Sequence, residues 1–192
     1  MLEWIHSVDR ALFFLINHAH SPLADKVMWT LSQTWPIVLL LLALGFGRYK
    51  KVGLRPAAEF LIGCAMVVAV TDFSANMIKH GVKRPRPTHN TEIQERVQVV
   101  NDYKGGAYGF FSSHAANTMA VVMLALLHLK EIALRYRIWL LALPLVVAYS
   151  RVYLGVHYPS DIAAGILYGC VTGYIGHRLL TLYFFKADET VV

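Results

Sequence analysis

The sequence predicts an all-α integral membrane protein: a helical bundle with about five transmembrane helices and a short interfacial helix at the amino terminus. Composition is one basis for this prediction, because 56% of the 192 residues are hydrophobic and only 16% are charged. The mean hydropathy of +0.46 lies well above that of a soluble domain of this size. The apolar residues also fall into long runs with short polar connections. We therefore expect residues 1–192 to form a single membrane domain.

The first element predicted is a helix at residues 3–19. Its apolar positions share one helical face, whereas Glu3, Asp9 and Arg10 lie elsewhere, a pattern that suits a helix lying in the membrane interface. A short helix packed on the bundle fits equally well. The chain starts without a basic region or a small-residue cleavage site, so we expect this helix to remain in the mature protein. The apolar positions are Trp4, Ile5, Val8, Leu12, Phe13 and Ile16.

Longer apolar segments then follow in order. The first, at residues 23–47, is long enough to cross a bilayer if tilted, and Pro36 should kink it. The later ones are expected at residues 55–80, 112–130, 136–153 and 159–180. Among the connections, only the stretch at residues 84–111 is long.

The remaining composition limits the partners. Cys64 and Cys170 both lie inside apolar runs, where a thiol behaves as a small hydrophobic group, so we expect neither a disulfide framework nor a zinc site. The formal net charge is +6, but the basic residues are spread over several connections and form no continuous basic stripe. We expect the bilayer and its anionic lipids as partners, and no nucleic acid. The oligomeric state stays open.

Basic residues also bear on orientation. The connections after the first and third spans are rich in lysine and arginine, and placing them inside puts the amino terminus outside. Basic residues on the opposite side prevent a decision by charge alone, unless those cations serve a site. The inner group is Arg48, Lys50, Lys51, Arg55, Lys130, Arg135 and Arg137, and the opposite group is Lys79, Lys83, Arg84, Arg86 and Arg151.

Three separated polar groups interrupt the apolar sequence, and with this orientation all three share the outer face. The first is Lys79, followed after six residues by Arg86 and Pro87. Lys79 falls on the last turn of a predicted helix, and Arg86 takes the extended backbone that precedes proline. A lysine and the planar fork of an arginine can bind one phosphoryl group from two directions. Alone, however, this group is explained more simply as the positive flank of a membrane helix.

The second polar group is Ser112, Ser113 and His114, directly before the apolar run that starts at Ala115. The serines therefore stand where a helix cap is expected, beside free backbone N–H groups and the positive end of the helix dipole. Such a helix start can bind an anion. A capping serine with an interfacial histidine explains the same residues.

The third polar group is the sharpest. Ser150 and Arg151 are followed by His157, and Asp161 comes four residues later. If a helix begins near Pro159, the carboxylate can hold one nitrogen of the imidazole and leave the other free to attack, as an activated nucleophile requires. A helix cap with a nearby histidine is the alternative.

Taken together, the three groups resemble the motifs of the type 2 phosphatidic acid phosphatase (PAP2) superfamily: K-x6-R-P, then P-S-G-H, then S-R-x5-H-x3-D. The first and third motifs match in full. The second departs from the pattern, with Phe111 in place of proline and Ser113 in place of glycine, while Ser112 and His114 are kept. The resemblance extends from Lys79 to Asp161, and the flanking hydrophobic pattern is similar to that of small bacterial membrane members.

This resemblance implies a role for each matching residue. His157 is implied to be the nucleophile that forms a phosphohistidine, with Asp161 orienting it and stabilising its charge. His114 is implied to protonate the leaving oxygen and then to activate water. The scheme implies no metal ion or other cofactor, and we expect none. The implied phosphate-binding residues are Lys79, Arg86, Ser112, Ser113 and Arg151.

Two polar residues outside the motifs are candidates for supporting roles. Asp72 lies two turns before Lys79 on the same predicted face and can pair with a cation of the site. Asn117 follows His114 by about one turn and can do the same. Structural pairing within the bundle is the favoured interpretation for both.

We therefore expect a multi-pass lipid phosphatase of the bacterial inner (cytoplasmic) membrane, with its active site facing the periplasm or outer side. The resemblance suggests undecaprenyl diphosphate, phosphatidylglycerol phosphate, phosphatidic acid or a lipid A phosphate as the substrate. A non-enzymatic lipid-phosphate binding or transport protein is the alternative, for which the altered Phe111 and Ser113 leave room. Soluble vanadate-dependent haloperoxidases share this type of site, but the apolar spans argue against a peroxidase.

Overall fold

The computed structural model describes residues 2–184, and within this range it is helical apart from loops and one isolated antiparallel bridge between Pro85 and Tyr108. The predicted all-α fold is confirmed. The α-helices are α1 (Leu2–Asn17), α2 (Pro22–Leu31), α3 (Trp35–Val52), α4 (Leu54–Val82), α5 (Ser113–His128), α6 (Leu134–Arg137), α7 (Ala142–Tyr153) and α8 (Pro159–Phe184). Three short 3₁₀ helices are η1 (Pro87–His89), η2 (Gln94–Arg96) and η3 (Ile138–Leu141).

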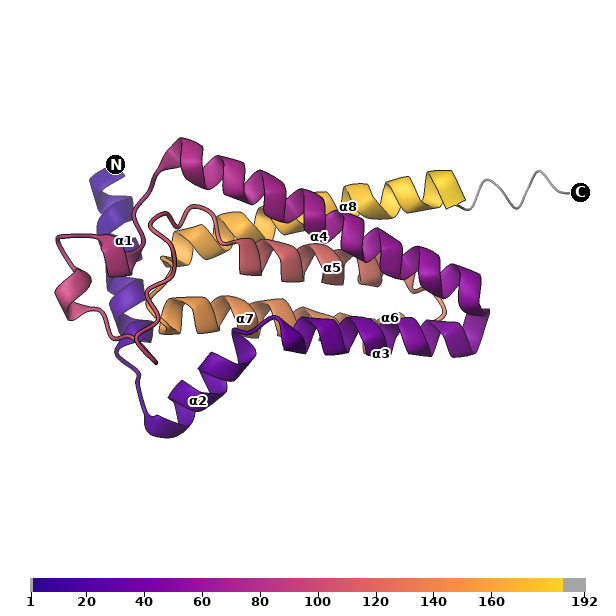
Figure 1. Ribbon diagram of the computed structural model, residues 1–192, viewed down its shortest axis with the longest axis horizontal. Coiled ribbons are helices and arrows are strands. Elements are labelled where there is room, and N and C mark those ends of the chain that lie inside the picture. Colours follow the sequence, from indigo (N-terminus) through magenta and orange to yellow (C-terminus); the bar gives the residue numbers. More distant parts are fainter. Residues whose placement is uncertain (1, 185–192) are drawn as a thin grey trace, which may run out of the picture.

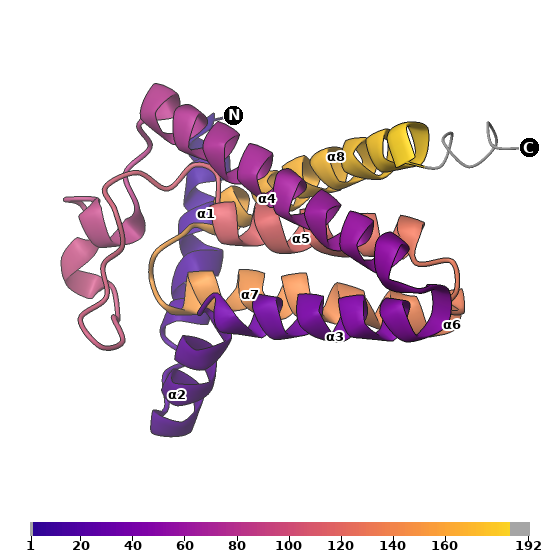
Figure 2. The same ribbon diagram turned by 45° about the vertical axis from the view of Figure 1, so that its right-hand side comes forward.

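The long helices share one direction. In Figure 1, α3, α4, α5, α7 and α8 run along the long axis of the molecule, and α1 crosses one end of this bundle. Figure 2 shows the same arrangement after a turn of the molecule, with the long loop between α4 and α5 gathered at the end where α1 lies. That end therefore holds the loop, α1, and the starts of α5 and α8.

The segment expected as one kinked span at residues 23–47 is two helices. The axes of α2 and α3 are bent by 53° at a break before Trp35, so the bend expected at Pro36 is present, but it is a break between two helices and lies just before this residue. The side chains of Ser32 and Gln33 donate hydrogen bonds to the carbonyl of Trp29, at 2.8 and 3.2 Å, and so compete with continuation of α2. Pro36 then lies in the first turn of α3, where its missing N–H is not needed.

The number of membrane crossings is not settled by helix length and composition. Among residues 2–184, α4 is the one helix long and apolar enough to cross a bilayer by itself, and the bent pair α2 and α3 would be a second if it counts as one span. At 16 residues, α5 is apolar but shorter, and the segment expected at residues 136–153 divides into α6, η3 and α7. About five crossings stays a prediction.

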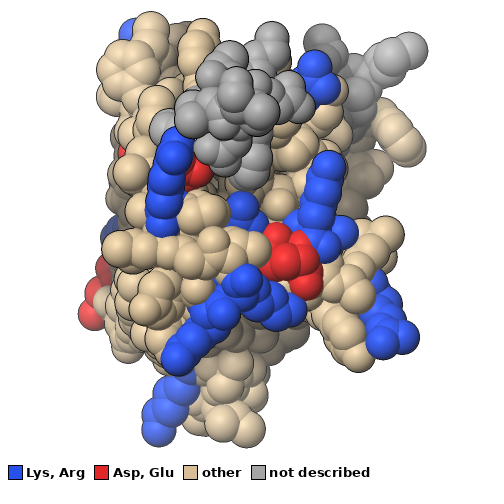
Figure 3. All heavy atoms as spheres, turned by 90° about the vertical axis from the view of Figure 1, so that its right-hand side faces the viewer, with Lys and Arg blue, Asp and Glu red and all other residues tan. Residues whose placement is uncertain are grey.

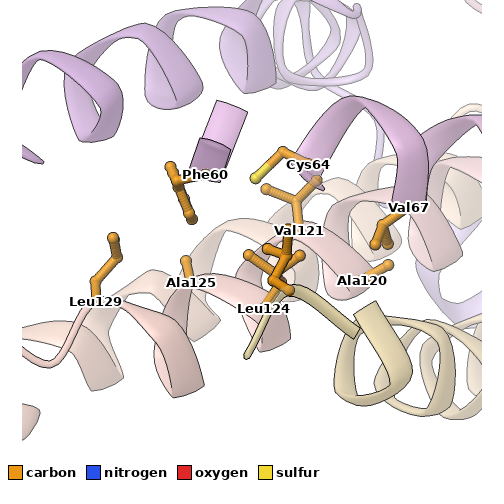
Figure 4. Packing of buried hydrophobic residues seen from close by; sticks show 9 residues of the cluster. Phe60, Cys64, Val67, Ala120, Val121, Leu124, Ala125 and Leu129 are labelled. Atoms are coloured by element: carbon orange, nitrogen blue, oxygen red, sulfur yellow. The ribbon is translucent and has the colours of Figure 1, made fainter. Parts of the chain in front are cut away.

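The hydrophobic core lies between α4, α5 and α8. Figure 4 shows Phe60, Cys64 and Val67 of α4 facing Val121 and Leu124 of α5. Cys64 is fully buried in this core, and both cysteines of the chain are free thiols.

Small residues let α5 and α8 approach closely, and these two helices form the most extensive helix contact in the described chain. A Cβ added at Gly165 would lie 2.7 Å from the carbonyl oxygen of Ser112, and one at Gly169 would lie 2.4 Å from that of Ala116. Gly173 continues this face one turn further along α8. Such spacing of small residues is the usual way in which membrane helices bring their backbones together. The contact places the second polar group directly beside the start of α8.

The opposite end of the bundle is basic. Figure 3 views this end and shows lysine and arginine side chains around a small acidic area. Arg48 is 5% exposed and donates to the carboxylate of Glu131 at 2.5 Å, while Lys51 donates to the backbone oxygen of Glu131 at 3.1 Å. These contacts place the basic segments after the first and third expected spans at the same end of the bundle.

Helix α1 has one face against the bundle and another exposed. Phe13 and Asn17 are fully buried, as expected if α1 is a short helix packed on the bundle. Asn17 also ties α1 to the end of α7 and to the long loop, because its amide donates to the carbonyls of Tyr153 and Gln98 at 2.9 Å each. A helix that lies in the membrane interface requires an exposed apolar face. Helix α1 has such a face, formed by Trp4, Val8, Leu12 and Leu15.

Replacing Gly169 by valine is expected to lower the stability of the protein by about 1–3 kcal/mol, because the new side chain must push α5 and α8 apart. Gly47→Val is the matched control, since a Cβ at Gly47 meets nothing within 4 Å. Thermal unfolding in detergent measures both variants. Equal unfolding temperatures for the two would contradict the role assigned to this close contact.

Candidate functional site

The three polar groups meet at the end of the bundle that α1 covers. Lys79, on the last turn of α4, donates a hydrogen bond to the hydroxyl of Ser113 at the start of α5. Nη1 of Arg86 lies 3.3 Å from Nε2 of His157, although the two residues are 71 positions apart in the chain. The structure thus brings together the residues that the sequence motifs single out.

Arg86 is held rigidly by backbone oxygens. Its main chain is extended, as the following proline predicts, and its N–H donates to the carbonyl of Ala107 at 3.0 Å. Its side chain donates to the carbonyls of Tyr108 and Val156, at 3.1 and 3.3 Å, and the residue is only 8% exposed. The guanidinium is therefore fixed beside the imidazole of His157.

Arg151 supplies a second buried guanidinium, and the residue is 2% exposed. It donates to the hydroxyl of Tyr103 at 3.0 Å, while its Nε is buried without a hydrogen-bond partner among residues 2–184. A buried donor of this kind is suited to an oxygen of a bound anion. Tyr103 is a site residue that the sequence did not indicate.

The serines open α5 as expected. Ser112 is the N-cap, and its hydroxyl accepts a hydrogen bond from the N–H of Ala115 at 3.5 Å. Ser113 stands where the family has glycine, and its hydroxyl gives Lys79 a partner that glycine lacks. Phe111 stands where the family has proline and packs its ring on Tyr168, with 4.7 Å between the ring centroids.

His114 is the second residue of α5 and is partly buried. It directly follows the serines that open this helix, at the end of α5 where the three polar groups meet.

His157 lies in the turn between α7 and α8, and Asp161 lies in the first turn of α8. Helix α8 begins at Pro159 as expected, but His157 precedes this helix and does not share its face. The turn depends on Gly155, which has a φ of +76° and would place a Cβ 3.0 Å from the carbonyl oxygen of Gln98. Nδ1 of His157 then faces Oδ2 of Asp161 at 3.5 Å, and the same oxygen accepts the N–H of Tyr158 at 3.0 Å.

The two ring nitrogens of His157 therefore have different neighbours. Nδ1 faces a carboxylate, which favours a proton on this nitrogen, and Nε2 faces the Arg86 donor, which favours a free electron pair there. Full burial, together with the cations Arg86, Arg151 and Lys79, holds the pKa of His157 well below the usual histidine value. A lowered pKa favours the neutral imidazole, the form in which a histidine can act as a nucleophile.

Arg84 and Asp9 belong to the site, although the sequence did not single them out for it. Arg84 donates to Asp161 and to Asp9 at 2.6 Å each, and its guanidinium lies 4.3 Å from the ring centre of Tyr158. Asp9, on α1, also accepts the N–H and the hydroxyl of Ser160, at 2.9 and 2.6 Å. The available signal was local and weak: Arg84 stands two residues before Arg86, and Asp9 is one of several polar residues on α1.

The favoured interpretation of Asp72 and Asn117 is supported by their contacts. Oδ1 of Asp72 accepts the amide of Asn117 at 3.3 Å, and Oδ2 accepts the amide of Asn76 at the same distance. The hydrogen bond from Asn117 joins α5 to α4, and the one from Asn76 lies within α4. Within residues 2–184, no group of three or more histidine, cysteine or acidic side chains is arranged to hold a metal ion.

The fold and this cluster define the class of protein: an α-helical membrane bundle with buried cations around a carboxylate-paired histidine at one end. The model of the PAP2 superfamily matches residues 60–184, and the chain belongs to this family. A lipid A 4'-phosphatase of Porphyromonas gingivalis is 30% identical over 182 residues, which cover 93% of this chain and 75% of that relative. The resemblance stated from the motifs is confirmed.

Solved structures share the fold. LpxE of Aquifex aeolicus superimposes with a TM-score of 0.66 at 23% identity, over 88% of this chain and 93% of that one. A transmembrane PAP2-type phosphatidylglycerolphosphate phosphatase of Bacillus subtilis gives a TM-score of 0.68 at 18% identity, over 98% of this chain and 88% of that one.

Arg84→Gln is expected to destabilise the protein by about 3–5 kcal/mol, because the buried carboxylates of Asp9 and Asp161 lose their cation. Arg10→Gln is the control, since its ion pair with Glu92 is exposed and should contribute at most about 1 kcal/mol. Denaturation in detergent compares the two. A loss for Arg84→Gln no larger than that for Arg10→Gln would show that the network is unimportant.

Wild-type stability should fall relative to His157→Asn by about 1 kcal/mol between pH 7 and pH 5.5. The pKa of His157 is lowered in the folded protein, so below about pH 6.5 the unfolded chain binds a proton that the folded protein does not. Unfolding curves of both proteins at the two pH values measure the difference. Parallel pH profiles would mean that His157 is not held neutral by the fold.

Proposed function

We propose that this protein is a lipid phosphatase, acting as a single domain, which removes a terminal phosphate from a lipid phosphate or diphosphate through a phosphohistidine. The observation that supports this proposal most strongly is the position of His157, with Nδ1 facing Asp161 at 3.5 Å and Nε2 facing Arg86 at 3.3 Å. A binding protein needs cations, but it has no need of a neutral imidazole oriented by a buried carboxylate.

In the first step, Nε2 of His157 attacks phosphorus, and the bond between phosphorus and the lipid oxygen breaks. His114 gives a proton to this leaving oxygen, and Asp161 stabilises the positive charge on the phosphorylated imidazole. Cations fixed before the substrate arrives stabilise the charge of the transition state without further rearrangement. The phosphoryl ligands in this proposal are Arg86, Arg151, Lys79, Ser112 and the backbone of Ser113.

In the second step, water attacks the phosphohistidine, and His114 accepts its proton. The bond between Nε2 and phosphorus breaks, inorganic phosphate leaves, and His157 returns to its neutral form. Both steps are balanced by groups of this chain and water, so the proposal includes no metal ion.

The substrate that best fits the comparisons is a phosphate of lipid A. The relative named for this activity matches 93% of the chain, so the likeness extends well beyond the motifs. We also propose that the site faces the periplasmic side of the bacterial inner membrane. The basic end formed by Arg48 and its neighbours would then face the cytoplasm.

The purified protein in detergent should release phosphate from lipid A in the presence of a chelator, and His157→Ala should lower the rate by at least about 1,000-fold. His80→Ala is the matched control, because His80 lies near the site on α4 but outside the motifs, and it should keep most of the activity. Undecaprenyl diphosphate, phosphatidylglycerol phosphate and phosphatidic acid complete the substrate panel.

Reactions with labelled substrate can then be quenched rapidly, and the label bound to the protein can be classified by its stability to acid and to alkali. Alkali-stable, acid-labile label on the wild type and none on His157→Ala would support the phosphohistidine. No release from any lipid by folded protein would instead favour the lipid-binding or transport alternative.

A further inference from the structure

Arg151 is held in the candidate site by a neutral partner. Its Nη2 donates to the hydroxyl of Tyr103 at 3.0 Å, and its guanidinium carbon lies 5.5 Å from the centre of the Tyr103 ring. Within residues 2–184, Arg151 makes no ion pair, whereas Arg48, buried to a similar degree, pairs with the carboxylate of Glu131. A hydroxyl fixes a guanidinium without neutralising it, so the charge of Arg151 stays available to an anion.

The same hydrogen bond restricts how the guanidinium can turn. Arg151 is 2% exposed, and its Nε is a buried donor that no described residue accepts. Because the guanidinium is planar and is held at one side by its own side chain and at the other by Tyr103, Nε keeps a single direction. The Tyr103 hydroxyl therefore sets the direction in which Arg151 can donate to a phosphoryl oxygen.

Tyr103 is itself fixed by a tight turn of the long loop. Its N–H donates to the carbonyl of Val100 at 3.1 Å, which closes a turn through Asn101 and Asp102. Both of these residues have a φ of +53°, a backbone conformation that asparagine and aspartate tolerate better than most other side chains. The local sequence thus favours the turn that brings the Tyr103 ring to Arg151.

The residues that follow Tyr103 reach the other buried guanidinium of the site. The carbonyl of Lys104 accepts the hydroxyl of Thr88 at 2.7 Å, which holds the loop against the segment that carries Arg86. Gly105 has a φ of +67°, and a Cβ there would lie 2.9 Å from Nη1 of Arg86. Residues 100–105 therefore lie against both guanidiniums that are proposed to bind the phosphoryl group.

Helix α2 supports the Tyr103 ring. Figure 1 shows α2 at the end of the bundle where the long loop lies. The ring of Trp29 on α2 meets that of Tyr103 edge to face, with 5.5 Å between the ring centroids, and both pack on a buried cluster that includes the turn before α8. Helix α2 is in turn tied to α7, because the hydroxyl of Tyr153 donates to Asp25 at 2.5 Å. The position of α2 thus reaches Arg151 through two aromatic rings.

We propose that Tyr103 is a positioning residue for phosphoryl transfer: its hydroxyl holds Arg151 in the orientation that stabilises the transition state, and Trp29 holds Tyr103. This inference rests on the proposed lipid phosphatase function and deepens it. Tyr103 acts through Arg151 and takes no part in bond making. A cation fixed in place before the substrate arrives stabilises the transition state more than one that must first be ordered, so the hydroxyl contributes to kcat more than to KM.

Tyr103→Phe removes the hydroxyl and keeps the ring. With the lipid of the panel that the wild type hydrolyses fastest, it should lower kcat about tenfold and change KM by at most about threefold. Tyr136→Phe is the matched control, because Tyr136 also lies beside an arginine, Arg135, but at the opposite end of the bundle, and it should change neither constant. An unchanged kcat for Tyr103→Phe would overturn the inference.

A double-mutant cycle separates a role through Arg151 from a merely structural one. Arg151→Ala removes the guanidinium, so adding Tyr103→Phe to this variant should change its residual kcat by less than about twofold. A further tenfold loss in the Arg151→Ala background would mean that Tyr103 acts independently of Arg151, and would reject the positioning role.

The support by α2 is tested in the same way. Trp29→Leu should lower kcat about threefold, and it should have no further effect when combined with Tyr103→Phe. Trp35→Leu, which changes a tryptophan of α3 that is 51% exposed, is the control and should leave kcat unchanged. Equal kcat values for the two tryptophan variants would show that Trp29 does not hold Tyr103.

Failure of the proposed function gives a different pattern, in which the wild type releases no phosphate from any lipid of the panel. Calorimetric binding of inorganic phosphate to the purified protein in detergent then tests the coupling by itself. Tyr103→Phe should weaken this binding about threefold in otherwise wild-type protein and leave it unchanged in Arg151→Ala protein. Equal effects in the two backgrounds, or no effect in either, would reject the coupling between Tyr103 and Arg151.

Discussion

The buried carboxylate of Asp161 is the group on which the rest of the site depends. It is fully buried, accepts hydrogen bonds from Arg84 and from the N–H of Tyr158, and faces Nδ1 of His157. A carboxylate buried without such partners would cost several kcal/mol. The chain can therefore bury Asp161 only when the loop that carries Arg84 and the turn that carries His157 are both in place. The contacts that stabilise this end of the bundle are therefore the same contacts that orient the imidazole.

The site also depends on the close packing of α5 on α8. The carbonyl of Asp161 accepts the N–H of Ser112 at 3.1 Å, a contact between the starts of two helices. Gly165 permits it, because any side chain there would meet the backbone of Ser112. A stripe of small residues, which carries no chemistry itself, thus sets the distance between the serines of one motif and the histidine of another.

Local patterns predicted much of this arrangement. The cap at Ser112 and the start of α8 at Pro159 depend on neighbours in the chain, and both were predicted from the sequence. The role of Asp9 was not, because its partners Arg84 and Ser160 lie 75 and 151 residues away and no local pattern records them. The bend between α2 and α3 was expected at Pro36, because proline is the residue that most often bends a helix. In the structure, hydrogen bonds of side chains just before Pro36 end α2. Sequence motifs do not specify the contacts between segments that are distant in the chain.

Helix α1 connects the surface of the bundle to the candidate site. One face exposes Trp4 to the surroundings, and another carries Asp9, which is 6% exposed and bonded to Arg84 and Ser160. If α1 moved away from the bundle, Arg84 would lose one of its two carboxylates and Ser160 would lose the acceptor of its N–H. The position of α1 is therefore coupled energetically to the carboxylate that orients His157. The arrangement of Asp161 beside His157 thus depends on the docking of one short helix.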